Sequence, residues 1–237
     1  MKYTRRRPFV ATLLVLSLTA LLVWLNTGAE AQSPPVDLSD DFNDNSLDTS
    51  KWNIISPGSP AVVSEQGQVI QIALPPNTAT YNGIGSKTTH DMRDKTMEVE
   101  VVQAPSHAGW VEHSIQVALD GSNYYLVGAG SGSIVFRSVV AGAQDQSQLN
   151  YDPVAHRFWG IRHDQASNKI SLQTSPDGVT WTTRKRVTAG FSLSAVYFYV
   201  YAGAWGTGNS NPGVAKYDNF QVVPSSSKIV NVAMALN

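Results

Sequence analysis

The chain has 237 residues, no cysteine and a formal net charge of −1. The lack of cysteine excludes disulfides and thiol nucleophiles, although an exported protein would be permitted disulfides. The near-zero charge, with no basic run beyond the first residues, argues against a nucleic-acid partner.

Residues 1–31 have the pattern of a secretory signal peptide. Arg5-Arg6-Arg7 precede an apolar run from Phe9 to Leu25, and Ala29-Glu30-Ala31 is a small-x-small cleavage pattern. We expect cleavage directly after this pattern and a secreted, periplasmic or cell-surface protein with no stable membrane insertion. Two alternatives stay open. The apolar run is slightly long, which would suit an uncleaved anchor, and the paired arginines would suit twin-arginine export.

The rest divides into a linker (32–39), one large domain (40–223) and a tail (224–237). Runs typical of β-strands are Val62–Val63, Gln68–Ala73, Met97–Gln103, Val111–Leu119, Tyr124–Val127, Ile134–Val140, Phe158–His163, Lys169–Thr174, Thr180–Val187, Ala195–Ala202 and Ala215–Val223. Turn residues such as Asp120-Gly121-Ser122-Asn123 separate them. So many short runs are too many for an immunoglobulin module. They predict an all-β fold with two antiparallel sheets packed as a jelly-roll sandwich.

The run Ser194–Trp205 (SAVYFYVYAGAW) has the clearest alternation in the chain. Successive strand residues point to opposite faces, so Val196, Phe198 and Val200 share one face, and Tyr197, Tyr199 and Tyr201 share the other. We expect the first face to fill the core between the sheets. The tyrosines then line either a second packed layer or a wet groove.

Three segments resemble the concanavalin A-like lectin/glucanase superfamily, in particular its non-catalytic, LamG-like members. They are the opening Asp40-Asp41-Phe42-Asn43-Asp44 with Lys51-Trp52, the hairpin Phe158–Trp181, and the closing Tyr217-Asp218-Asn219-Phe220-Gln221-Val222. The resemblance covers roughly Asp37–Val223. It implies a concanavalin A-like jelly roll, a fold that hosts lectins, glycosidases and adhesive modules alike.

Catalytic members of this superfamily resemble one another in a strand motif Glu-x-Asp-x-Glu. Alternation places its outer carboxylates on one face, where a retaining mechanism needs them about 5 Å apart. The nearest match here is Glu98-Val99-Glu100, but the third position of that face is Val102. We therefore predict a non-catalytic protein in which Glu98 and Glu100 are exposed charges. A glycoside hydrolase with an atypical site is the first alternative.

Sugar rings have flat C–H faces and a rim of hydroxyls, so a sugar site needs aromatic platforms beside polar groups. The predicted site has six members: Tyr197, Tyr199, Tyr201, Trp205, Arg162 and Gln116. The predicted function is exported, lectin-like carbohydrate binding, with a glycan or polysaccharide as partner. The second alternative is a structural or adhesive envelope module without a small ligand.

The resemblance also implies a structural Ca²⁺ where the first and last strands of the domain meet. The matching positions are Asp41, Gly67 and Asp218. Calcium takes carboxylate and backbone carbonyl oxygens in a loose shell, which these positions would supply. No other cofactor is expected.

Overall fold

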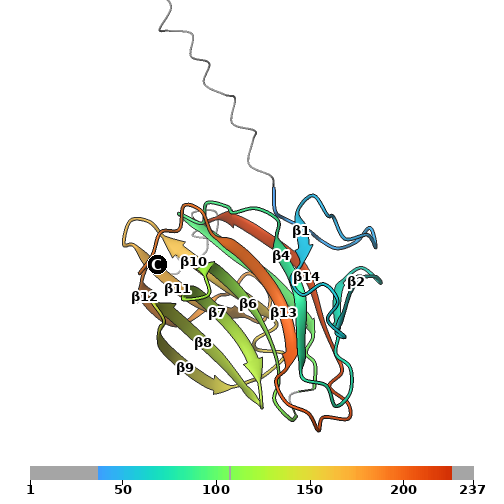
Figure 1. The fold of residues 1–237 in the computed structure, drawn as a ribbon. Helices are drawn as coiled ribbons and strands as arrows, with labels where there is room; N and C mark the ends of the chain where they lie inside the picture. Colours follow the sequence, from blue (N-terminus) through green and yellow to red (C-terminus); the bar gives the residue numbers. More distant parts are fainter. Residues whose placement is uncertain (1–36, 107, 226–237) are drawn as a thin grey trace, which may run out of the picture. The chain divides into compact units, whose positions relative to one another are not determined.

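The structure is a computed structural model that describes residues 37–106 and 108–225. Two antiparallel sheets of seven strands each face one another, which confirms the predicted β-sandwich (Figure 1). Sheet I has the order β1 (Trp52–Ile54), β4 (Thr80–Ser86), β13 (Tyr197–Ala204), β6 (Val111–Asp120), β7 (Asn123–Gly130), β8 (Ser133–Val140) and β9 (Ala143–Asn150). Sheet II has the order β12 (Thr182–Thr188), β11 (Lys169–Ser175), β10 (Phe158–Asp164), β5 (Lys95–Gln103), β14 (Val214–Pro224), β3 (Ile70–Ala73) and β2 (Val62–Glu65).

The core lies between the inner faces of the two sheets. Phe198 and Val200 of β13 are fully buried there, as the alternation predicts, and the Phe198 ring packs edge-on against Phe220 of β14 in the opposite layer, with 6.4 Å between centroids. Because successive strand residues alternate, filling this core fixes which side chains point outward. The three tyrosines of β13 are therefore on the outer face of sheet I.

The opening and closing segments of the domain meet, as the resemblance implies. Asp40 forms an antiparallel bridge with Phe220, and the Phe220 ring packs edge-on against Trp52 at 4.9 Å between centroids. The Trp52 indole Nε1 donates to Asp40 Oδ2 at 2.8 Å. These contacts fix the start of the domain beside β14.

The predicted leader (1–31) and nearly all of the predicted tail lie outside the described residues. Among residues 37–106 and 108–225, no helix is long and apolar enough to cross a membrane.

Candidate functional site

The outer face of sheet I carries an aromatic groove of about 470 Å³. Tyr197, Tyr199 and Tyr201 line it from β13 and are half-buried, whereas their neighbours Phe198 and Val200 are fully buried. Gln116 also lines this groove. β6 and β4 flank β13 on its two sides, so the groove follows three adjacent strands (Figure 1).

Glycines on β4 leave room for the tyrosine rings. Gly83 pairs with Tyr201 and Gly85 pairs with Tyr199 on the outer face. A Cβ atom on Gly85 would lie only 2.7 Å from two ring atoms of Tyr199. The ring therefore lies across the neighbouring strand, a position that any residue larger than glycine would obstruct. The two glycines of the sequence TYNGIGS thus leave space over β4 for the rings that line the groove.

β6 supplies the polar groups of this face. Glu112, Ser114 and Gln116 alternate outward and pair with residues of β13. The Tyr201 hydroxyl donates to Gln116 Oε1 at 3.3 Å. Burial raises the pKa of Tyr201 to about 12, and the Glu112 charge adds to this. At neutral pH the Tyr201 hydroxyl is therefore protonated and able to donate.

Trp205 closes one end of the groove. Its side chain is 51% exposed, its ring stacks on Tyr81 with 5.4 Å between centroids, and its indole Nε1 donates to Glu112 Oε1 at 2.5 Å. Tyr81 is itself 43% exposed and lines the same groove. Two contacts thus hold this exposed indole in one orientation.

A second, smaller hollow of about 180 Å³ lies beside the groove. Trp205 lines both spaces. The hollow is also lined by Trp110, Glu112, Ser114, Arg137 and the glycines Gly128 and Gly130.

The structure brings together five of the six predicted sugar-site residues. Tyr197, Tyr199, Tyr201, Trp205 and Gln116 all line the groove.

The prediction for the sixth residue, Arg162, is wrong. Arg162 lies on β10 in sheet II, where it pairs with Thr96 and Ser171, so it is not on the tyrosine face. Strand neighbours are decided by long-range pairing, which the local pattern around Arg162 does not encode.

Sequence reasoning missed Tyr81, Trp110, Glu112 and Arg137. One usable signal was present, because Glu112 lies four residues before Gln116 and must share its face.

The prediction that Glu98 and Glu100 are exposed charges is also wrong. They point outward from β5, but they are only 3% and 7% exposed. Arg157 donates to Glu100 through Nε at 2.8 Å, and Asn219 Nδ2 donates to its other oxygen at 2.9 Å. Gln221 Nε2 contacts Glu98 Oε2 at 3.3 Å. Side chains from β14 and from the segment before β10 thus cover both carboxylates.

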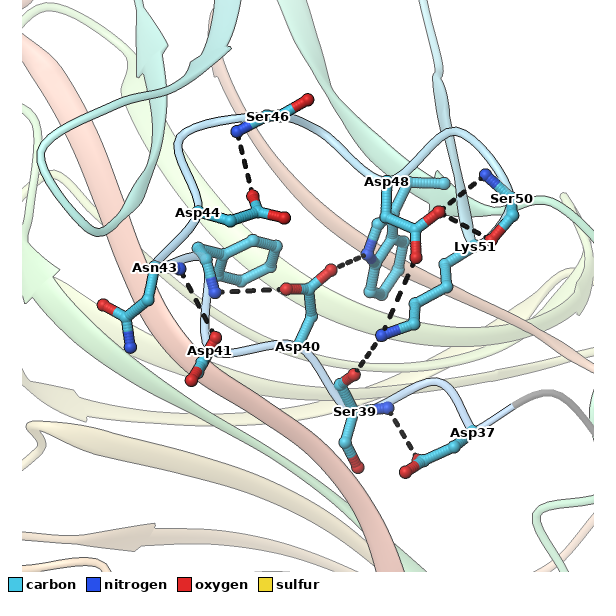
Figure 2. Close-up of polar contacts among 12 residues, drawn as sticks. Asp37, Ser39, Asp40, Asp41, Asn43, Asp44, Ser46, Asp48, Ser50 and Lys51 are labelled. Atoms are coloured by element: carbon cyan, nitrogen blue, oxygen red, sulfur yellow. Dashed lines mark hydrogen bonds and ion pairs between the residues drawn. The ribbon is translucent and has the colours of Figure 1, made fainter.

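The predicted calcium residue Asp41 lies in an acidic loop over residues 37–51. Figure 2 shows the side chains of this loop, which line a hollow of about 650 Å³. Asp40, Asp41, Asp44 and Asp48 each accept a backbone N–H from the residue two positions on. The aspartates therefore stabilise successive turns of the loop as well as making it acidic.

Asp218 lies close to this loop. Partial burial raises the pKa of its carboxyl, and the negative charges of Glu100 and Asp41 raise it further. Gly67, at φ +63°, donates its N–H to Asn45 Oδ1 at 2.7 Å. Within the part of the chain that the structure describes, no group of three or more His, Cys, Asp or Glu side chains is arranged to hold a metal. Asp41 and Asp218 carry carboxylate oxygens, which are among the donors that calcium takes.

Comparison with known proteins gives the fold alone. No family model matches the chain, and no curated protein matches it. Solved structures do. A glycosyl hydrolase family protein from Mycobacterium fortuitum is similar with a TM-score of 0.56 at 14% identity, over 78% of this chain and 97% of that one.

Two further solved structures are similar. A Bacteroides ovatus GH16 protein from a mixed-linkage glucan locus, solved with an oligosaccharide product, has a TM-score of 0.54 at 12% identity, over 78% of this chain and 98% of its own. A legume lectin-like domain from Entamoeba histolytica has a TM-score of 0.51 at 9% identity, over 73% and 88%.

The fold is that of the concanavalin A-like jelly rolls. These neighbours share so little sequence that the likeness concerns the fold alone. Hydrolases and a lectin-like domain stand side by side among them, so any function for this chain must be argued from its own site.

Proposed function

We propose that this is an exported protein that binds a glycan through the tyrosine groove on sheet I and does not hydrolyse it. The observation that carries the proposal is the row of half-buried tyrosines, Tyr197, Tyr199 and Tyr201, on an outer sheet face. At strand rise the outer two are about 13 Å apart, a length that underlies two or three sugar units. Aromatic platforms beside the Gln116 amide suit the flat faces and hydroxyls of sugar rings.

The carboxylates of this face support binding rather than hydrolysis. Glu112, Ser114 and Gln116 repeat the spacing of the Glu-x-Asp-x-Glu motif, but a hydroxyl and an amide stand at its second and third positions. Among the described residues that line the two hollows, the carboxylates are Glu112 and Asp120. These are about 26 Å apart along β6, well beyond the 5–10 Å that paired glycosidase carboxylates need.

A glycan array followed by calorimetry on the best hits tests the proposal. Tyr199→Ala should weaken glycan binding by roughly 1–2 kcal/mol, because one aromatic contact is lost, with little change in stability. Phe198→Ala, its neighbour on the buried face, should instead cost roughly 3–5 kcal/mol of unfolding free energy through a core cavity. Recovery of a chain that begins near Gln32 from outside the producing cell tests export.

The alternatives predict different results. A wild-type protein that binds nothing on the array favours the structural or adhesive module. Hydrolysis of a polysaccharide that is abolished by Glu98→Gln, Glu100→Gln or Glu112→Gln would overturn the non-catalytic part of the proposal.

A structural calcium ion is a second part of the proposal, supported by the raised pKa of Asp218 and the closeness of Asp41. A cation there would relieve the repulsion between the two carboxylates. Chelator should then lower the melting temperature, and Asp218→Asn should remove this sensitivity, because binding stabilises by mass action. A melting curve that responds to neither calcium nor chelator argues against the ion.

A further inference from the structure

The small hollow beside the tyrosine groove has the size of a site for one sugar residue. Its volume is about 180 Å³, against about 470 Å³ for the groove. At roughly 30 Å³ of liquid volume per water molecule, the hollow has room for about six waters. That space suits a single sugar ring with its hydroxyls and is too small for a continuing chain.

A strained turn builds one wall of this hollow. Gly109 and Trp110 both have positive φ, at +63° and +67°, a region that is costly for a bulky side chain. Asn209 Nδ2 donates to the Ala108 carbonyl at 2.6 Å, and the Trp205 N–H donates to the Trp110 carbonyl at 3.1 Å. The surrounding loops therefore hold the turn in place, and Trp110 remains 73% exposed. Strain that serves to present an exposed indole indicates a contact surface.

The floor and the polar groups complete the site. A Cβ atom on Gly128 would lie 2.8 Å from Ser114 Cβ, so glycine keeps the floor low. Glu112 reaches the hollow from β6, and Arg137 reaches it from β8, where its Nε donates to Gln146 Oε1 at 3.3 Å. One acceptor and one donor of opposite charge suit the hydroxyls of a neutral sugar.

Trp205 lines both the groove and the hollow, so its position shows how the two lie relative to each other. The groove follows β13 between β4 and the second half of β6, whereas the hollow extends across the start of β6 toward β7 and β8. Trp205 stands between them, held by Tyr81 on the groove side and by Glu112 on the hollow side. A chain that followed the tyrosines would pass the hollow on its flank. The hollow is therefore open to a substituent of that chain and lies off its path.

We propose that the ligand is a branched glycan, whose main chain lies over the tyrosines and whose single-residue side branch enters the hollow between Trp110 and Trp205. This inference rests on the proposed glycan binding and adds the class of glycan. Trp110 and Arg137 are then specificity residues for the branch.

The test compares probes that share a main chain and differ in the branch. Calorimetry on the full protein would use three pairs of matched length: cello-oligosaccharide with xyloglucan oligosaccharide, linear with galactosyl-substituted mannan oligosaccharide, and linear with arabinosyl-substituted xylan oligosaccharide. We expect at least tenfold tighter binding of the branched member of one pair. Trp110→Gly relieves the strained φ and so preserves folding, and it should remove that preference while leaving the affinity for the linear member unchanged.

Two further variants separate the outcomes. Arg137→Gln should reduce the preference about threefold or more, and Val154→Ala, an exposed residue outside both spaces, should leave it unchanged. Equal affinity for branched and linear members, or equal weakening of both by Trp110→Gly, overturns the branch site and leaves glycan binding standing. If no member of any pair binds, the proposed function fails and this inference fails with it.

Discussion

On the outer face of each sheet an aromatic ring packs over a glycine, but the surroundings of the ring are open on sheet I and closed on sheet II. On sheet I the Tyr199 ring lies over Gly85, and on sheet II the Trp181 ring lies over Gly160, where an added Cβ would be 2.8 Å from the ring. On sheet II the indole Nε1 donates to the Gly178 carbonyl of its own turn, and the face beside it is closed by covered carboxylates. On sheet I the rings line an open groove. An aromatic ring over glycine is therefore not by itself a sign of a ligand site.

The difference lies in what surrounds the rings. Glu98 and Glu100 on sheet II are covered by side chains that arrive from other elements. The corresponding outward positions of β6 on sheet I are Glu112, Ser114 and Gln116, which border two hollows. Glu112 and Gln116 also accept internal hydrogen bonds, but they still border open space, whereas other side chains cover the carboxylates of sheet II.

We expect the largest loss of stability when a covered carboxylate on the outer face of sheet II loses its partner. Arg157→Ala removes the ion pair of Glu100 and leaves a carboxylate that is 7% exposed with the Asn219 amide. We expect the unfolding free energy to fall by about 2 kcal/mol in urea denaturation, because the arginine side chain of this pair is itself half-exposed. Arg186→Ala, which breaks the more exposed pair with Asp164, should cost less than about 0.5 kcal/mol. Equal losses in the two variants would mean that water replaces Arg157. Glycan affinity should not change in either.

A smaller change in stability is expected from Glu65, the buried carboxylate at the end of β2 in sheet II. No arginine of the described residues bonds to Glu65 as Arg157 does to Glu100, and burial first, then Asp44 and Asp40, raise the pKa of Glu65 to about 7. The folded protein therefore keeps a proton that the unfolded chain loses above its ordinary pKa of 4.5. Stability should fall as pH rises from 4.5 to 7 and then level off.

Glu65→Gln should remove this pH dependence, because the amide reproduces the protonated carboxyl and still accepts from the Ser46 N–H. At pH 8 the variant should be more stable than wild type by roughly 1 kcal/mol, after allowance for solvent screening. Melting temperatures across pH 4–8, with chelator in every buffer, measure the effect. Parallel curves for the two proteins would contradict it.

The sequence predicted best where one residue pattern decides the structure. The alternation on β13 placed Phe198 in the core and Tyr199 outside, because burial of one strand face fixes the other. The residue pattern did not predict the strands β4 and β9. Two glycines weaken the strand pattern of Thr80–Ser86, and Ala143–Asn150 is a mostly polar edge strand that adds little to the core.

The candidate site was predicted only in part for a related reason. Tyr197 and Tyr199 were found because they lie on one strand. Arg162 was placed on the wrong sheet, and Glu100 was expected to be exposed, because both depend on which distant strands become neighbours. Trp110 escaped notice because its exposed position comes from a turn that Asn209, far along the chain, holds in place.

The smallest effect on stability is expected for a substitution that changes the groove without removing any of its side chains. It tests the difference between the two sheet faces most directly. Gly85→Ala adds one methyl group, 2.7 Å from the Tyr199 ring and 3.0 Å from Ile55 Cγ2. Tyr199 is half-buried, so its ring should tilt away from β4, with a stability loss below about 1 kcal/mol. Glycan affinity should fall roughly three- to tenfold, equivalent to about 0.7–1.4 kcal/mol, because the platform is no longer flat. Gly160→Ala is the matched control, since it adds the same methyl group 2.8 Å from the Trp181 ring on sheet II, away from the groove. Unchanged affinity in Gly85→Ala, measured by the same calorimetry, would mean that the orientation of Tyr199 over β4 does not matter for binding, and that the glycines of β4 serve packing alone, as Gly160 does on sheet II.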